Sequence, residues 1–196
     1  MADFISEFMK SLGPEVSKQM AGSLGIKQND VMKMIPQVAP LILGGLKRQK
    51  DERGGPERVD HILNKYGSAD VLGDIGGLFE AFMGGQRSAD PQLGGLLGES
   101  GNQATNLLSQ QFKLDGSTAS KIIPMLAPLI LGFLTQKRDT QGAGSSGIAA
   151  LLDQDGDGSI LDDVAGFLLS GGGGQKGGGG GLLGGLLGAL FGGKKR

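Results

Sequence analysis

The chain has 196 residues, which is enough for one or two small domains. It contains no Cys and a single His, so its composition excludes disulfide frameworks, Cys-ligated zinc, iron–sulfur clusters and sites built from several His side chains. Its 19 basic and 20 acidic residues give a formal net charge of -1, which argues against nucleic acid as a partner.

The N-terminal segment, residues 1–12, carries Asp3, Glu7 and Lys10 and lacks the basic start and apolar core of a signal peptide. Nowhere do 18 apolar residues run together, as an ordinary membrane-spanning helix requires. We therefore expect a cytoplasmic protein.

Two helices are predicted next. Apolar residues at helical spacing begin at Val16, and Gly25 is suited to end this helix in the left-handed conformation. Asn29 or Asp30 is expected to cap the helix that follows, and Ser117 to cap its later counterpart.

A long stretch of the second helix occurs twice in the chain. Residues 33–46 recur at residues 121–134, an offset of 88, with 10 of the 14 positions identical. With one more residue of offset, residues 62–75 align with residues 151–164. Such self-similarity predicts an internal duplication.

The predicted fold is all-α: a duplicated helical array with Pro-kinked central helices and a disordered Gly-rich C-terminal tail. The first helical repeat covers residues 1–88, the second covers residues 89–170, and the tail covers residues 171–196. Strand signals are weak, because no apolar–polar alternation is sustained.

Each copy of the long helix contains a Pro-x-x-x-Pro pair, Pro36 and Pro40 in the first. A proline ring removes an amide donor and clashes one turn back, so we expect the helix to bend or break there. The bend favours a core helix that wraps its neighbours, and the alternative is a groove for a partner. The apolar triplets 41–43 and 129–131 are expected to be buried centrally.

Polar stretches separate the repeated blocks. Residues 49–58 and 136–147 are rich in charge or in Gly and Ser, and both are expected to be exposed connections. The cluster of Lys47, Arg48 and Lys50 favours a solvated helix end, where cations complement the helix dipole, over a phosphate site.

The sharpest chemical signal is an Asp-rich loop at residues 153–163. Alternating carboxylates followed by Gly158 at the sixth position resemble an EF-hand loop, and converging hard oxygens suit Ca²⁺. The candidate ligands are Asp153, Asp155, Asp157, Ser159, Asp162 and Asp163.

The loop departs from the EF-hand pattern because Val164 stands where a bidentate Glu is expected, so weak affinity is predicted. The alternative is an acidic turn whose Asp side chains cap the next helix. The first copy has Asn64, Tyr66, Ser68, Ala69 and Asp74 at matching positions, and these residues cannot assemble an ion site. The first copy is therefore expected to form the same loop without a metal. This favours an ion that stabilises the loop over an ion that acts as a sensor.

The C-terminal tail combines a Gly-rich linker with a Leu-rich segment that ends in Lys194, Lys195 and Arg196. Its glycines oppose a free helix in water, so ordering requires another helix, a second chain or a lipid surface. We expect contact with an anionic membrane surface or with protein, including self-association, or else a disordered tail. The predicted contact residues are Leu182, Leu183, Leu186, Leu187, Leu190 and Phe191.

Together, the duplicated Ile-Pro-x-x-Ala-Pro-Leu-Ile-Leu-Gly helix, the Asp-rich loop and the Gly/Leu-rich end resemble the bacterial DUF937 family, related to YidB-like proteins. The likeness covers roughly residues 1–170. It implies an all-helical array and a bacterial source, and it implies no activity.

An enzyme is the weaker expectation, since catalysis needs a positioned acid, base or nucleophile. His61 is expected at the surface or edge of a helix, and no phosphate-binding Gly-x-x-x-x-Gly-Lys motif occurs. The sequence predicts a non-enzymatic binding or scaffold protein with a Ca²⁺ loop. The alternative is a membrane- or envelope-associated effector that acts through its tail.

Overall fold

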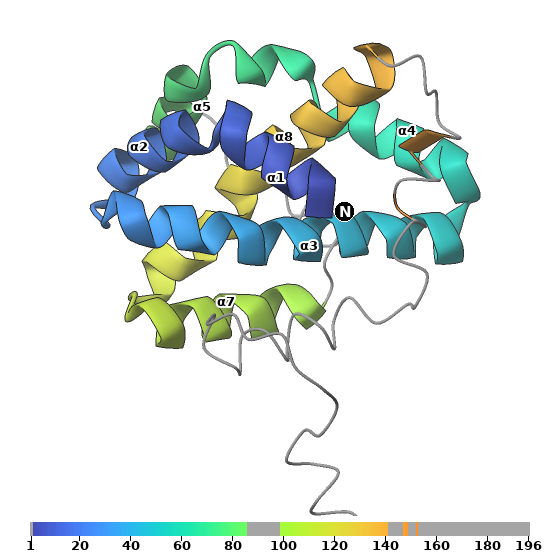
Figure 1. The fold of residues 1–196 in the computed structure, drawn as a ribbon. Helices are drawn as coiled ribbons and strands as arrows, with labels where there is room; N and C mark the ends of the chain where they lie inside the picture. The colour runs from blue at the N-terminus through green and yellow to red at the C-terminus, as the bar shows by residue number, and fades with distance from the viewer. Residues whose placement is uncertain (1, 86–98, 141–146, 149–151, 153–196) are drawn as a thin grey trace, which may run out of the picture.

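The structure, a computed structural model, describes residues 2–85, 99–140, 147, 148 and 152 (Figure 1). Seven α-helices and one 3-10 turn account for most of these residues, and no strand occurs among them, so the predicted all-α class is confirmed. The elements are α1 (Ala2–Ser11), α2 (Gly13–Leu24), α3 (Gln28–Arg53), α4 (Gly55–Tyr66), η1 (Ala69–Leu72), α5 (Ile75–Met83), α7 (Glu99–Phe112) and α8 (Gly116–Thr140).

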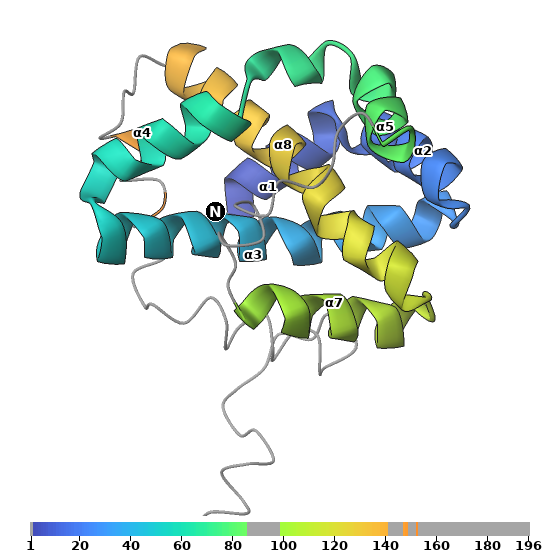
Figure 2. The ribbon, with the colours of Figure 1, turned by 180° about the vertical axis from the view of Figure 1, so that it is seen from behind.

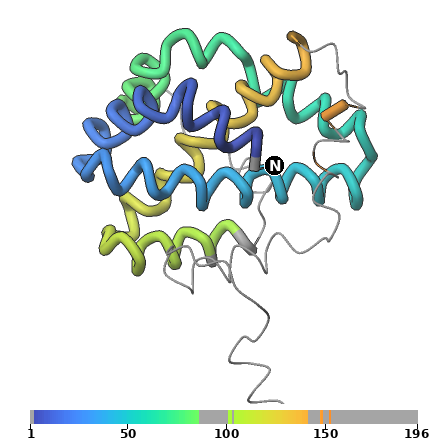
Figure 3. Tube along the Cα trace, in the orientation of Figure 1, coloured from blue at the N-terminus to red at the C-terminus, as the bar shows by residue number. Residues whose placement is uncertain are grey.

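Two helical hairpins, α2–α3 and α7–α8, have the same turn. Gly25 ends α2 in the left-handed conformation, with φ 66° and ψ 30°, as predicted. The amide of Ile26 donates to the carbonyl of Ala21 at 3.1 Å. The turns lie on the same side of the molecule in the chain trace (Figure 3).

The second turn repeats these features 88 residues later. Lys113 has φ 54°, and the amide of Leu114 donates to the carbonyl of Ser109 at 2.9 Å. These matches support the predicted duplication.

The predicted N-caps are wrong in position. α3 begins at Gln28, so Asn29 and Asp30 lie inside its first turn, and Lys27 at the cap provides no side-chain hydrogen bond. In α8 the cap is Asp115 rather than Ser117, because the Asp115 carboxylate accepts the amide hydrogen of Thr118 at 2.9 Å.

The two central helices do not break at their prolines. α3 has 26 residues and α8 has 25, and each continues through both prolines. A proline inside a helix costs about 3 kcal/mol, and burial of the flanking side chains offsets this cost. The triplets 41–43 and 129–131 are buried as predicted, with at most 6% of any side chain exposed.

α3 and α8 cross and contact each other in the centre of the molecule, α8 behind α3 in Figure 1 and in front of it in Figure 2. α4 packs against both of them, and η1 packs against α8. Elements from the first half of the sequence therefore pack directly on the long helix of the second half.

The expected connection at residues 49–58 is mostly helical. α3 runs to Arg53 and α4 starts at Gly55, so Gly54 alone separates them, with φ 130°. Gln49 is only 6% exposed. The charged residues belong to helix ends, and glycine supplies the backbone conformation that the sharp reversal needs. In the second copy, residues 136–140 belong to α8, and residues 141–146 lie outside the described residues.

Candidate functional site

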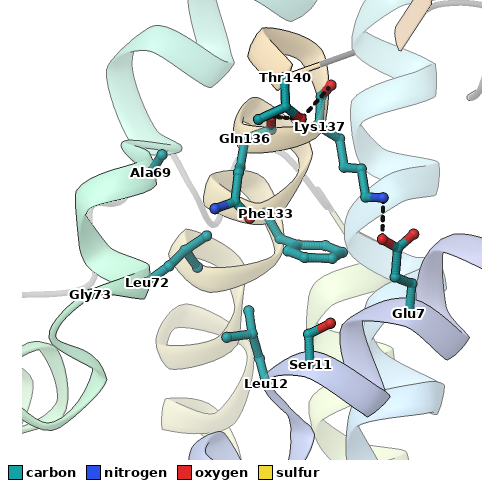
Figure 4. Close-up of a pocket in the computed structure, with 10 residues that line it drawn as sticks. All are labelled: Glu7, Ser11, Leu12, Ala69, Leu72, Gly73, Phe133, Gln136, Lys137 and Thr140. Atoms are coloured by element: carbon teal, nitrogen blue, oxygen red, sulfur yellow. Dashed lines mark hydrogen bonds and ion pairs between the residues drawn. The ribbon is translucent and has the colours of Figure 1, made fainter.

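A cleft of about 600 Å³ opens between α1, η1 and the C-terminal half of α8 (Figure 4). Its walls come from three parts of the chain that are far apart in sequence, so tertiary packing alone creates it. The lining residues are Glu7, Ser11, Leu12, Ala69, Leu72, Gly73, Phe133, Gln136, Lys137 and Thr140.

Aromatic packing positions the α1 wall of the cleft. Phe4 and Phe8 are one helical turn apart on α1, and both rings meet Phe133 of α8. The ring centroids lie 5.3 Å and 5.5 Å from that of Phe133, with interplanar angles of 55° and 78°. These tilted and edge-to-face contacts are favourable for aromatic quadrupoles. All three side chains are at most 4% exposed, so α1 is fixed to α8 by an apolar contact.

An ion pair lies at the rim of the cleft. The Lys137 ammonium donates to the Glu7 carboxylate, and it also lies 5.7 Å from the centroid of the Phe133 ring. The Glu7 side chain is 49% exposed, so the pair contributes at most about 1 kcal/mol to folding. Its main effect is to place one charge of each sign beside the apolar wall.

The lining therefore combines two kinds of surface. Leu12, Leu72 and Phe133 offer apolar contact, whereas Ser11 and Gln136 offer hydrogen-bonding groups. Figure 4 shows Leu72 pointing from its turn toward α8, opposite the α1 wall. Apolar walls with a few polar groups are typical of binding sites for peptides and small amphiphilic molecules.

The predicted calcium ligands, Asp153, Asp155, Asp157, Ser159, Asp162 and Asp163, lie outside the described residues. Within the part of the chain that the structure describes, no group of three or more His, Cys, Asp or Glu side chains is placed to hold a metal. The predicted contact residues of the tail, Leu182 to Phe191, also lie outside this part.

The first copy shows what the matching positions do without an ion. Ser68, which aligns with Asp157, accepts the amide hydrogen of Asp70 at 3.3 Å and caps η1. Asp74, which aligns with Asp163, accepts the amide hydrogen of Gly77 at 2.8 Å and caps α5. Two of the predicted ligand positions thus correspond to helix caps, as the alternative interpretation requires.

Among the described residues, α8 is the one helix long and apolar enough to cross a membrane. Of its most apolar 18-residue window, 78% is buried inside the molecule. This burial is typical of the central helix of a folded core.

Comparison with protein families identifies the chain. A family model described as a bacterial protein of unknown function, DUF937, matches residues 6–137 and again residues 135–196. The chain belongs to the DUF937 family. No curated protein and no solved structure matches it. Membership of DUF937 confirms the resemblance found in the sequence, and it assigns no activity.

The cleft of this DUF937 protein was not predicted, although the sequence contained a signal for it. Within the repeated 14 residues, Phe133 replaces Gly45, the largest change in side-chain volume between the two copies. An apolar ring that only one copy carries indicates a contact that only one copy makes. The partner, α1, has Phe4 and Phe8 at helical spacing on one face.

Proposed function

We propose that this protein is a non-enzymatic helical binding or scaffold protein whose cleft between α1, η1 and α8 receives a Leu-rich peptide segment. The observation that carries the proposal is the cleft itself, with apolar side chains from all three walls and charged groups at its rim. The tail of the same chain, residues 181–196, has the matching chemistry because leucines precede a basic end. Docking of the tail in the cleft of a second copy would give self-association.

Cross-linking tests this proposal cleanly because the chain has no Cys. Ser11→Cys with Leu186→Cys places one thiol at the cleft and one in the tail. We expect this pair to form a disulfide under mild oxidation. A non-reducing gel then separates cross-links within one chain from cross-links between two chains.

The matched control is Met83→Cys with Leu186→Cys. Met83 is the large apolar side chain most exposed among the described residues, at 45%, and it does not line the cleft. Equal cross-linking of the two pairs would reject the cleft as the docking site.

We further propose that the Asp-rich loop binds Ca²⁺ weakly. Support comes from the alternating carboxylates, which repel one another unless a cation or amide donors neutralise them. Titration calorimetry with Ca²⁺ should give saturable heat that disappears in Asp155→Ala and Asp157→Ala. Heat that persists in both variants, or no heat from the natural protein, would favour the capping role that the first copy illustrates.

The alternative function is that of a membrane- or envelope-associated effector. It is favoured by the basic end of the tail, where each charge adds about 1 kcal/mol on an anionic surface. Flotation with vesicles of phosphatidylglycerol and phosphatidylethanolamine separates the two functions. If the membrane role holds, vesicles carry the natural protein but not Leu186→Asp/Leu187→Asp. If the cleft role holds, neither protein floats.

A further inference from the structure

The turn after α4 lies unusually close to α8. A Cβ atom added at Gly132 would lie 2.8 Å from the carbonyl oxygen of Ser68 and 3.1 Å from Val71. A Cβ atom added at Gly67 would lie 2.8 Å from the carbonyl oxygen of Leu131. Two backbones can approach this closely only where neither residue carries a side chain. The pair Gly67 and Gly132 therefore defines the contact.

Further along α8, the Arg138 cation binds α4, the helix that precedes this turn. The Arg138 guanidinium donates to Asp60 and to Asn64 of α4, each at 3.1 Å. It also donates to the neighbouring Asp139 at 2.8 Å. Only 15% of the Arg138 side chain is exposed, so these bonds form partly away from water, where charged hydrogen bonds are stronger.

The other half of the sequence repeats most of this contact, although Asp60 aligns with Ala149. Through the offset of 88, Gly132 aligns with Gly44 and Arg138 with Lys50, both on α3. Through the offset of 89, Gly67 aligns with Gly156 and Asn64 with Asp153. Asp139, the acid next to Arg138, aligns with Asp51, the acid next to Lys50.

Lys50 lies 3.2 Å from Asp51, as Arg138 lies beside Asp139. The repeat therefore preserves the glycine pair and the cation. It loses the carboxylate of Asp60 and gains one at Asp153, in place of the Asn64 amide.

Two described residues just before the Asp-rich loop are buried like the residues of α4 with which they align. Ile148 and Leu152 are 2% and 0% exposed, and they align with Val59 and Leu63, each at 0%. The same two side chains are therefore buried at residues 148 and 152 as in α4. The Asp-rich residues follow at once.

The charges of α3 and of the Asp-rich loop are complementary, which favours contact between them. The α3 surface around Gly44 carries Lys47 and Lys50, whose side chains are 21% and 10% exposed. Both pair with Asp51, at 2.7 Å and 3.2 Å, so the three side chains together leave a net positive charge. The segment that follows Leu152 carries five Asp residues between 153 and 163. A basic helix surface and an acidic segment attract each other at short range.

We propose that residues 153–163 dock on α3, with Gly156 against Gly44 and the Asp153 carboxylate paired with Lys50. α3 thereby becomes the docking surface for the second turn, as α8 is for the first. This arrangement does not depend on the proposed function. Ca²⁺ and Lys50 compete for Asp153, so the test is made with a chelator present.

A charge exchange tests the ion pair in the full chain. Lys50→Glu should lower the melting temperature, and Lys50→Glu with Asp153→Lys should restore the part of the loss that comes from this pair, because the two charges attract again; the part that comes from Asp51 remains. The control exchange, Lys50→Glu with Asp155→Lys, should restore much less. Equal rescue by both exchanges, or rescue by neither, would overturn the proposal.

Replacing glycine by alanine tests the backbone contact, because the melting temperature should rise at an open position and fall at a close contact. Gly22→Ala on α2 is the control for an open helix surface, since an added Cβ there meets nothing within 4 Å, and it should raise the melting temperature. Gly132→Ala should lower it. Gly44→Ala should also lower it if the segment docks there, and a rise would overturn the proposal. A fall at Gly44 without specific rescue by Asp153→Lys also overturns it, because another segment then covers Gly44.

Discussion

Single residues at helix ends differ between the two copies in ways that affect stability. Lys113 occupies the left-handed position that Gly25 occupies in the first hairpin, with φ values of 54° and 66°. A residue with a side chain is disfavoured in this conformation by about 1 kcal/mol, whereas glycine adopts it freely. The second hairpin therefore stores strain that the first lacks.

A reciprocal pair of substitutions measures this strain. Lys113→Gly should raise the free energy of unfolding in urea by roughly 0.5–1 kcal/mol, and Gly25→Lys should lower it by a similar amount. If both substitutions raised, or both lowered, the free energy of unfolding, the left-handed backbone conformation would not be the cause.

The cap of α8 predicts a pH dependence. Hydrogen bonds from the Ser117 hydroxyl, the Thr118 hydroxyl and the Thr118 amide hold the pKa of Asp115 well below its ordinary value of 3.8. A carboxylate whose folded pKa is depressed contributes stability that is complete above the unfolded pKa and is lost as pH falls through the folded pKa. The contribution of this cap should therefore be constant near neutral pH and decline below about pH 4.

Denaturation of the natural protein and of Asp115→Asn at several pH values tests this cap. Asparagine retains a capping oxygen and removes the charge. We expect the natural protein to be the more stable at pH 7 and the difference to shrink steadily as the pH falls below about 4. A difference that grows on acidification would show that another group controls it.

At the scale of elements, α1 packs against α2 and α3 and meets α8 through the Phe133 ring. Phe133 meets both Phe4 and Phe8, and it forms one wall of the cleft. The ion pair between Glu7 and Lys137 is too exposed to hold α1 alone. The apolar contact with Phe133 therefore contributes more than the ion pair to holding α1 at this wall of the cleft.

Phe133→Ala should lower the free energy of unfolding by about 3–5 kcal/mol and should release α1 before the rest of the molecule. Hydrogen exchange should show lost protection of the α1 amides and retained protection in α3. The control is Phe133→Leu, which keeps most of the apolar volume and should keep α1 protected. Equal protection of α1 in all three proteins would show that other contacts hold it.

At the scale of the whole molecule, α3 and α8 share one core. Leu43 and Leu131 occupy matching positions on the two helices, and each is 0% exposed. Because η1 and α4 of the first half also pack on α8, loss of packing in one half removes contacts of the other. We therefore expect the described core to unfold as one cooperative unit.

Leu43→Ala and Leu131→Ala should each lower the stability by about 2–5 kcal/mol. In both variants the transitions followed by far-UV circular dichroism and by Tyr66 fluorescence should coincide. Separate transitions in either variant would show that the halves unfold independently.

The sequence by itself determined the helical class, the family and the recurrence of the long Pro-containing helix, because side-chain periodicity and repeated motifs are local properties. It also located the buried triplets and the left-handed glycine after α2. It misplaced the caps, because Asn, Asp and Ser near a helix start are all suitable and only the observed first turn selects one.

Only the tertiary structure decided where the halves meet. The cleft depends on Phe133 meeting α1, which lies far from it in the sequence, and no local pattern encodes which distant surface a ring will contact. The same holds for the approach of Gly67 to Gly132, since a missing side chain leaves space without naming its occupant. Burial is a property of the assembled core, so these contacts became visible only when the helices were packed together.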